Sequence, residues 1–507
     1  MQDITLQDKN QLFDTDHLKT GLKERAVKSA GITLAAQGIK LILQLGSIAI
    51  LARLLLPSDF GLIAMVTVFT GLALQFMEGG LSMATIQREH ITHAQVSNLF
   101  WVNGALGAGL CLLGVLISPL VAIIYDEPRL TLVMAAMSLT FLIGGLSVQH
   151  DALLRRQMRF KAVSVIDIVS MATGIIAGVT AAYNGLEYWA LVISPVGTIA
   201  TKTIMCWLIV RWVPSLMSRG SGVRPLLGFG ANLTGANFIG YIATNVTPFA
   251  VGYIGGAQSL GLFNRANVLT SIPSSQMLPP VMNVLQPTLA RVAHDPKRLR
   301  STLTSIMGKL VLATMFVTLT MAILADWIVK LFLGSGWEGA VPIFQMLAVF
   351  SLVEPIAGFL AVSLIAIGNA KALLRWKTIT LSILIVSVGI GSYWGAFGVV
   401  TAYALSGVFI RLPGFLYYAS RFLPVTFGEF IKALLPTGVC ALLTAAALHF
   451  LKQHTLIQNP IAGLAVFIAA AAVIYLLLCL LTKPTRNELI GIIDLIKLLT
   501  TRKLASK

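Results

Sequence analysis

Seven ionisable side chains fall inside otherwise apolar stretches of this sequence, and they are its strongest candidates for chemistry. An ionisable group within a membrane-spanning helix costs roughly 2.5 to 3.5 kcal/mol to insert, so each one calls for a physical reason. Arginine offers a planar fork that can hold an anion through two parallel hydrogen bonds, whereas lysine acts as a mobile point charge. The four cations are Lys40, Lys202, Arg265 and Arg411, and the three acidic counter-charges are Glu78, Asp167 and Glu354.

A second interpretation of these groups is structural, with every cation paired to a carboxylate so that the pairs hold helices together. Four cations exceed three anions, so complete pairing would leave one cation over. The surplus makes complete pairing the less favoured interpretation. Asp151, Lys309 and Asp326 lie near the ends of apolar stretches, where a side chain can reach the membrane surface, and no function is assigned to them.

The elements that must position these groups are about fourteen apolar segments, each long enough to cross a bilayer, between about Gly31 and Leu481. Hydrophobic residues make up 56% of the 507 residues and charged residues 11%, which excludes an ordinary soluble domain. The sequence therefore predicts an all-α polytopic membrane protein. The spans are expected near residues 31–52, 60–85, 98–124, 130–152, 162–183, 188–210, 227–252, 259–290, 303–333, 339–367, 378–394, 396–420, 433–451 and 460–482.

The positive charges predict the orientation of these spans. If the N-terminus is cytoplasmic, 28 of the 37 Lys and Arg residues fall in the tails and in alternate connections, all on the cytoplasmic side. We therefore expect both termini, and the loop from Arg155 to Lys161, to be cytoplasmic. The net charge is +17, but the cations are spread over many loops and do not form one face. This spread predicts that the protein has no nucleic-acid partner.

An internal repeat of about 200 residues divides the chain. Leu51–Ile63 aligns without gaps on Val251–Phe263, and both segments contain Gly-Leu just after a predicted outer turn. Six spans per copy would relate the copies by an axis along the membrane normal. The predicted regions are a cytoplasmic tail at 1–30, an N-lobe at 31–212, a C-lobe at 227–420, a final pair of spans at 433–482 and an amphipathic cytoplasmic tail at 485–507.

Helix-breaking residues indicate candidate moving parts. Pro273, Pro279 and Pro280 fall within one predicted span, where each proline removes a backbone hydrogen bond and bends the helix. We expect a gate there, and static kinks that improve packing are the alternative. The sequence contains no nucleotide-binding loop, metal-binding motif or nucleophile motif, so no cofactor and no enzymatic activity are expected. Any energy would then come from a Na⁺ or H⁺ gradient or from substrate supply and removal.

Several motifs resemble one known family. They are Ile50–Leu62, Glu78–Ser82, Ile86–Glu89, Leu99–Asn103, Gly261–Ala266 and Gly334–Glu338. Together they are similar to the Wzx-type polysaccharide flippases, most closely the colanic-acid-exporter-like branch of the multidrug/oligosaccharidyl-lipid/polysaccharide exporter superfamily. The resemblance runs from about residue 23 to 425, and the order and spacing of the motifs are more specific than any single one.

The resemblance implies two six-helix lobes in a V around a central cavity. It also implies movement of an undecaprenyl-diphosphate-linked oligosaccharide from the cytoplasmic to the periplasmic leaflet of a bacterial inner membrane. Lys40, Lys202, Arg265 and Arg411 would then hold the diphosphate or an acidic sugar. The bilayer and this glycan are the expected partners, with a polysaccharide polymerase and chain-length machinery as further candidates.

Two other functions stay open at this point. A cation-coupled drug antiporter of the same superfamily would need a net acidic cavity, which the surplus of cations disfavours. A membrane-embedded polymerase or ligase would need a large extramembrane loop, and no predicted outer connection exceeds about ten residues. The flippase is the leading hypothesis.

Overall fold

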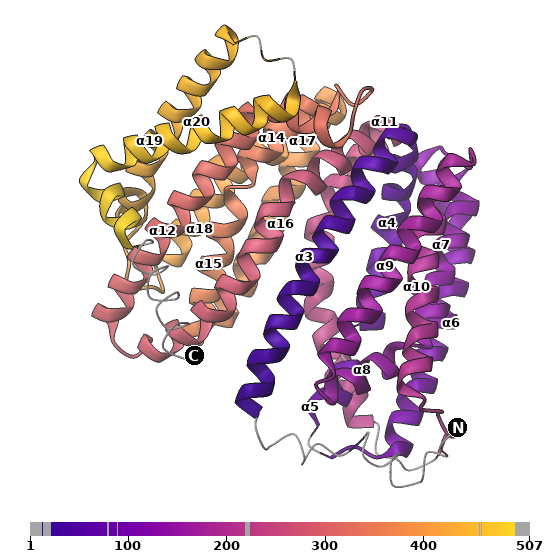
Figure 1. The fold of residues 1–507 in the computed structure, drawn as a ribbon. Coiled ribbons are helices and arrows are strands. Elements are labelled where there is room, and N and C mark those ends of the chain that lie inside the picture. The colour runs from indigo at the N-terminus through magenta and orange to yellow at the C-terminus, as the bar shows by residue number, and fades with distance from the viewer. Residues whose placement is uncertain are drawn as a thin grey trace. The chain divides into compact units, whose positions relative to one another are not determined.

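The chain folds into helices joined by short connections, as the computed structural model shows (Figure 1). The structure describes Phe13 and residues 22–78, 81–88, 90–218, 224–455, 457 and 459–491. Within these residues no strand is present. The chain divides into two compact units, which we call unit 1 (Met1–Gly261) and unit 2 (Leu262–Lys507). The prediction of an all-α protein is confirmed.

Unit 1 contains the helices from α3 to the first part of α11. They are α3 (Leu22–Leu54), α4 (Pro57–Glu78), α5 (Leu81–Gln87), α6 (His93–Tyr125), α7 (Leu130–Gly145), α8 (Val148–Arg156), α9 (Phe160–Tyr183), α10 (Trp189–Val210) and α11 (Arg224–Val292). Helix α9 packs against both α3 and α10, and α7 packs against α4, α6 and α10. This arrangement brings α3, α9 and α10, which carry three of the predicted site residues, into one group of neighbours.

Unit 2 contains the rest of α11 and the helices that follow it. They are α12 (Pro296–Ile323), α13 (Ala325–Phe332), α14 (Ala340–Phe350), α15 (Val353–Ala366), α16 (Ala370–Gly391), η1 (Ser392–Trp394), α17 (Gly395–Ser406), η2 (Gly407–Arg411), α18 (Leu412–Ala419), α19 (Phe427–His454) and α20 (Pro460–Leu481). Helix α12 packs against α14, α15 and α19, and α20 packs against α13 and α19. The final pair of predicted spans therefore joins unit 2.

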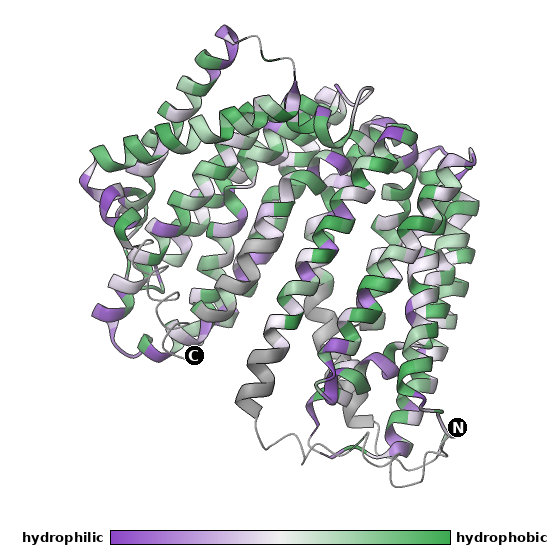
Figure 2. Cartoon of the chain, viewed as in Figure 1, coloured by the Kyte–Doolittle hydropathy of each residue, from purple (hydrophilic) through white to green (hydrophobic). Residues whose placement is uncertain are grey.

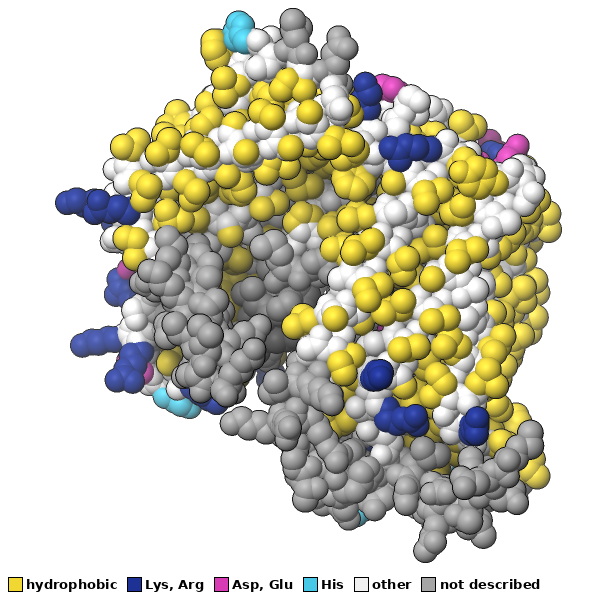
Figure 3. Space-filling model, viewed as in Figure 1, with side chains coloured by type: hydrophobic (Ala, Val, Ile, Leu, Met, Phe, Trp, Pro, Cys, Tyr) yellow, Lys and Arg dark blue, Asp and Glu magenta, His cyan; other side chains and the backbone are white. Residues whose placement is uncertain are grey.

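Ten helices of the described chain are long and apolar enough to cross a membrane, or eleven when α7 and α8, bent by 43°, count as one span. Their outer faces are hydrophobic (Figures 2 and 3). On α6, for example, Leu116 is 67% exposed and Ile123 is 76% exposed. Leucine and isoleucine rows of this kind are stable when hydrocarbon surrounds them. The chain is a multi-pass membrane protein, and the number of fourteen spans stays a prediction.

Polar residues start several of these helices, a few residues before the predicted spans. Thr92 and Gln95 form a capping box at the start of α6, in which the Thr92 hydroxyl accepts from the Gln95 N–H and the Gln95 side chain accepts from the Thr92 N–H. Asp295 caps α12 by accepting from the N–H groups of Lys297 and Arg298. Such caps satisfy backbone donors that the first helical turn leaves unpaired.

Helix α11 is interrupted at a place that differs from the predicted gate. Its non-helical residue is Gly256, with φ of 67° and ψ of −171°. The backbone is helical through Pro273, Pro279 and Pro280, and the side chains of the last two lie outside the described residues. The gate therefore stays a prediction, and so does the division into lobes at 212–227. The boundary between the compact units falls later, at Gly261, and places the first part of α11 in unit 1.

The predicted amphipathic tail begins after α20. Residues 483–491 are helical, and the remainder of the tail lies outside the described residues. Glu488 lies 3.5 Å from the Lys309 ammonium of α12, and Leu489 packs against the apolar cluster around Cys440 and Tyr475. The described part of the tail is thus docked on unit 2 through one ion pair and one apolar contact.

Candidate functional site

Five charged side chains of unit 1 form an alternating row, which we call the charge cluster. Lys40 Nζ lies 3.3 Å from Asp167 Oδ2, and Lys202 Nζ lies 3.8 Å from Asp167 Oδ1. Lys202 Nζ also lies 3.9 Å from Asp151 Oδ1, and Arg155 Nε lies 2.6 Å from Asp151 Oδ2. The order along the row is Lys40, Asp167, Lys202, Asp151 and Arg155.

Four helices supply the charge cluster. Lys40 comes from the middle of α3, Asp167 from α9, Lys202 from α10, and Asp151 and Arg155 from one face of α8. Residues four apart on a helix are neighbours, which explains the short Asp151–Arg155 contact. Because α8 turns away from α7 at the 43° bend, it carries its pair to the ends of α9 and α10 next to the loop predicted to be cytoplasmic.

The charge cluster combines half-burial with an incomplete charge balance. Between 18 and 39% of each side chain is exposed, so these groups are neither free in water nor sealed in the interior. Three cations share two carboxylates, which leaves a net charge of +1. Two of the four contacts are longer than 3.5 Å, beyond the range of a direct hydrogen bond. An entering anion could therefore replace a carboxylate at Lys202 without breaking a strong contact.

The buried arginine of unit 2 has different surroundings. Arg411 ends the π-helical turn η2 and is 8% exposed. Its guanidinium carbon lies 4.8 Å from the Tyr403 ring centroid and 5.2 Å from that of Phe350, and Nη2 donates to the Tyr403 carbonyl at 2.6 Å. Among the described residues Arg411 Nε has no acceptor and no carboxylate lies within ion-pair distance. Rings and one backbone carbonyl hold this cation.

The other predicted site residues are not brought into the charge cluster. Arg265 lies on the part of α11 that belongs to unit 2 and donates to Asn264 Oδ1 from Nη2 at 2.7 Å and from Nε at 3.2 Å. Glu354 lies in the first turn of α15. The side chain of Glu78 lies outside the described residues. Their predicted roles, and that of Arg411, stay predictions.

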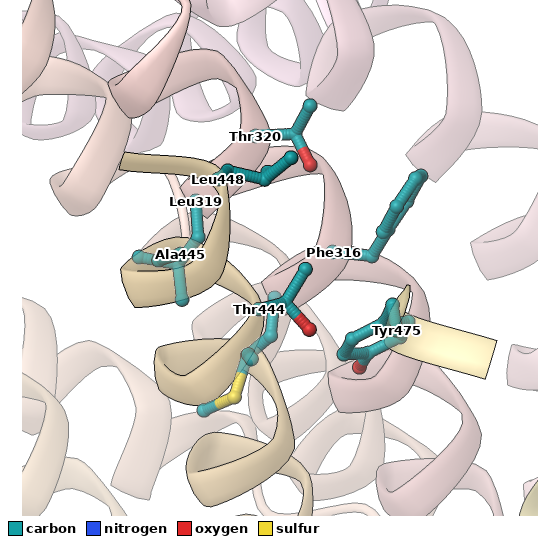
Figure 4. Close-up of a pocket in the computed structure, with 9 residues that line it drawn as sticks. Phe316, Leu319, Thr320, Thr444, Ala445, Leu448 and Tyr475 are labelled. Carbon is teal, nitrogen blue, oxygen red and sulfur yellow. The ribbon is translucent and has the colours of Figure 1, made fainter. Parts of the chain in front are cut away.

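A narrow crevice lies among α12, α19 and α20 (Figure 4). It encloses about 170 Å³, its open side included, between Phe316 and Thr320 of α12, Thr444 and Leu448 of α19, and Tyr475 of α20. Its lining is mostly apolar, and the Tyr475 hydroxyl donates to the Leu312 carbonyl at 2.8 Å. No charged side chain lines this crevice, so it offers nothing to a diphosphate.

The sequence analysis did not foresee the contacts of two charged residues. Asp151 was expected at the membrane surface without a role, yet it joins Lys202 to Arg155; the Asp-x-x-x-Arg spacing is the signal that could have indicated the pair. Arg156 was expected to be a loop cation, yet it is 4% exposed. It donates to the carbonyls of Phe13, Thr85 and Arg88, and Phe13 is buried with its ring centroid 5.6 Å from that of His93. Phe13 is the sole Phe, Tyr or Trp among residues 1–30, which could have indicated its burial.

The charge cluster offers more cations than carboxylates. In the part of the chain that the structure describes, no group of three His, Cys, Asp or Glu residues could hold a metal ion. The four cysteines are free, and Cys206, Cys440 and Cys479 are buried in helices. Cations shared between carboxylates on several helices are the feature that a negatively charged cargo would use.

Comparisons with known proteins place the chain in a family. A profile of the family described as "Polysaccharide biosynthesis protein" matches residues 50–342. The lipopolysaccharide biosynthesis protein WzxC of Escherichia coli (strain K12) is 24% identical over 82% of this chain and 85% of its own length. The teichuronic acid biosynthesis protein TuaB of Bacillus subtilis (strain 168) is 26% identical over 94% of this chain and 98% of its own length.

A solved structure shows the same fold. The lipid II flippase MurJ in an inward closed conformation superposes with a TM-score of 0.69, covering 90% of this chain and 98% of that one at 14% identity. The helices, the motifs and the matched profile agree. The chain belongs to the polysaccharide biosynthesis protein family.

Proposed function

We propose that this protein moves an undecaprenyl-diphosphate-linked oligosaccharide from the cytoplasmic to the periplasmic leaflet of a bacterial inner membrane by alternating access. The charge cluster is the observation that carries the proposal, because it supplies three half-buried cations for two carboxylates. A diphosphate accepts charge-assisted hydrogen bonds from lysine and arginine and would satisfy this surplus. The names of WzxC and TuaB place both proteins in polysaccharide biosynthesis, which supports a glycan as the remainder of the cargo.

In this proposal the carboxylates keep the cations in place while the site is empty. Asp167 holds Lys40 and Lys202, and Asp151 holds Lys202 and Arg155. When the diphosphate enters from the cytoplasmic side, it replaces the carboxylates at Lys202, where the contacts are longest. The charge cluster carries a net charge of +1, so it attracts a diphosphate, and this attraction is stronger in a half-buried site than in water.

Deletion of the gene followed by analysis of undecaprenyl-linked intermediates tests the proposal. The wild-type gene should remove the accumulated intermediate, whereas Lys202→Gln should export at least about tenfold less, a loss of about 1.4 kcal/mol. Lys309→Gln is the matched control, since Lys309 forms one ion pair with Glu488 outside the charge cluster. Stable Lys202→Gln protein that exports at the wild-type rate would exclude the charge cluster as the cargo site.

The orientation of the protein belongs to the same proposal. Both termini should be cytoplasmic, since a cluster beside the Arg155–Lys161 loop can then load cargo from the leaflet in which it is synthesised. Reporter fusions at Arg159 and Lys507 should show cytoplasmic activity. A periplasmic signal at either position would contradict the direction of transport.

Measurements of export and of the undecaprenyl-linked intermediates also bear on the driving force and on the alternative function. Collapse of the H⁺ gradient or of the Na⁺ gradient, one at a time, should stop export if one of these ions is coupled to it. A drug antiporter would instead raise drug tolerance and leave the lipid-linked intermediates unchanged. Co-purification of a polysaccharide polymerase or of chain-length machinery would extend the list of partners.

A further inference from the structure

The charge cluster depends on the position of α8, which supplies Asp151 and Arg155. This helix has nine residues. A helix of that length is marginally stable by itself, because nucleation of the first turn is costly, so contacts with neighbouring elements must fix its position. Helix α8 packs against α5, α6, α9 and α10, all within unit 1. The place of Asp151 relative to Lys202 is therefore set by the contacts that hold α8.

Helix α8 presents a second row of side chains, which we call the anchored stripe. It consists of Gln149, Leu153 and Arg156, at positions i, i+4 and i+7, and all three are buried. Asp151 and Arg155 each come two residues after a member of this stripe, which turns them roughly 200° around the helix axis. One side of α8 thus carries the charges of the cluster, and the other side is packed into unit 1.

Hydrogen bonds fasten the anchored stripe to two other parts of the chain. The Thr85 hydroxyl of α5 donates to Gln149 Oε1 at 2.7 Å. Arg156 Nη1 donates to the carbonyls of Thr85, at 3.0 Å, and Arg88. Arg156 also donates to the Phe13 carbonyl, from Nε at 3.3 Å and from Nη2 at 3.1 Å. Because the donors of a guanidinium form a rigid fork, these bonds fix the end of α8 in direction as well as in distance.

The side chain of Phe13 adds an apolar contact at the same place. It belongs to the buried apolar cluster that contains Leu153 and Leu154 of α8 and Cys206 of α10. Its ring lies edge to face with the His93 ring, with centroids 5.6 Å apart. Edge-to-face pairs of rings favour a restricted geometry. Phe13 carries no charge, so its side chain can affect the charge cluster only through the position of α8.

We propose that Phe13 and Arg156 are positioning residues for the charge cluster. They hold the anchored stripe, and this keeps Asp151 and Arg155 next to Lys202, where the cargo binds. Lys202 Nζ and Asp151 Oδ1 are 3.9 Å apart, which is too long for a direct hydrogen bond, so this pair holds α8 only weakly. A binding site is precise when supporting contacts fix the residues that bind. The inference rests on the proposed function, in which the cluster binds a diphosphate.

The native thiol of Cys206 provides a probe for the position of α8, because it is buried in the same apolar cluster as Phe13. The test uses full-length protein in bilayer nanodiscs and a small water-soluble maleimide. The other three cysteines are changed to Ala; they are Cys111, Cys440 and Cys479. Phe13→Ala and Arg156→Lys should each raise the rate of Cys206 modification at least about fivefold, since local opening of α8 becomes easier. Phe467→Ala is the matched control, because it removes a buried ring from α20 in unit 2, and it should leave this rate unchanged.

The affinity for inorganic pyrophosphate is the second measurement. Phe13→Ala leaves every charge of the protein in place, and Arg156→Lys retains the net charge. Each should nevertheless weaken pyrophosphate binding at least about fivefold, because Asp151 and Arg155 no longer stay at Lys202. Phe467→Ala should bind pyrophosphate as tightly as wild type. A loss of stability without a change in α8 would not produce this pattern.

Phe13→Leu keeps the test decisive if the alanine variant does not fold. It retains an apolar side chain without the ring, and it should change both measurements in the same direction by at least about twofold. Folded variants with the wild-type rate at Cys206, a faster rate with unchanged pyrophosphate affinity, or equal effects of Phe467→Ala would each overturn the proposal. If the wild-type chain binds no pyrophosphate, the proposed function fails instead, and the Cys206 rates still decide whether Phe13 and Arg156 hold α8.

Discussion

The cations of unit 1 and Arg411 of unit 2 all lie in apolar regions, but different partners stabilise them. Lys40, Lys202 and Arg155 are half-exposed and share two carboxylates across four helices. Arg411 is 8% exposed and lies against the rings of Phe350 and Tyr403. Its Nη2 donates to the carbonyl of Tyr403, eight residues earlier in the chain. Both arrangements lower the cost of an ion in an apolar region.

The difference indicates which cations can change partner. A carboxylate on a neighbouring helix can be replaced by another anion, and the remaining contacts of the cluster keep the helices in place. The rings and the carbonyl around Arg411 are parts of the local packing. Replacing them would disrupt the π-helical turn η2 that holds this residue. A surplus of intramembrane cations therefore does not by itself say which of them meets the cargo.

Arg411→Ala gives the largest effect expected from this comparison. The change leaves a cavity between Phe350 and Tyr403 and should lower the free energy of unfolding by about 3 kcal/mol. Thermal unfolding and the amount of inserted protein measure the loss. Arg421→Ala is the matched control, because Arg421 also stacks on a tyrosine, Tyr417, at 4.8 Å but is exposed. A stable Arg411→Ala protein that no longer exports glycan would instead assign Arg411 to the cargo.

Arg156→Gln tests a third arrangement, in which a cation is held by three carbonyls from two chain segments. The change leaves the Phe13, Thr85 and Arg88 carbonyls short of a donor, and we expect about 2 kcal/mol less stability. Limited proteolysis should also cleave the N-terminal segment faster. The neighbouring Arg155→Gln is the control, since it removes a half-exposed charge. Equal cleavage rates in the two variants would show that Arg156 does not anchor Phe13.

An exchange of charges separates pairing from cargo binding in the charge cluster. Asp167→Lys alone places four cations around one carboxylate and should reduce the amount of folded protein. Adding Lys40→Asp restores an opposite-charge pair between α3 and α9 and should restore the protein. Export should stay about tenfold below wild type, about 1.4 kcal/mol, because α3 has lost its cation. If the exchanged protein exports normally, the position of the cation on α3 is irrelevant.

The boundaries of the helices were largely predictable, and their partners were not. Spans near 188–210 and 460–482 correspond to α10 and α20 because hydropathy is local and reports each segment by itself. The matched turns at Pro57 and Ala257 were also visible, as a repeat. Contacts between helices depend on rotation and depth, which one sequence does not encode locally. That is why Asp151 was left without a role and why the surroundings of Arg411 were not foreseen.

Glu127→Gln, which removes the ion pair with Arg129 outside the spans, should have the smallest effect on stability. Its carboxylate accepts from Arg129 Nε and Nη2, each at 2.8 Å, and this pairing lowers the pKa of Glu127. A carboxyl whose folded pKa is lowered contributes stability above its unfolded pKa, near 4.3, and loses it as the pH falls through the folded pKa. The pair is partly exposed, so the contribution should stay below about 1 kcal/mol. The melting temperature of wild type should therefore exceed that of Glu127→Gln by a small amount at pH 7, and this difference should vanish on acidification. A difference that grows below pH 4 would show that the pair does not stabilise the fold.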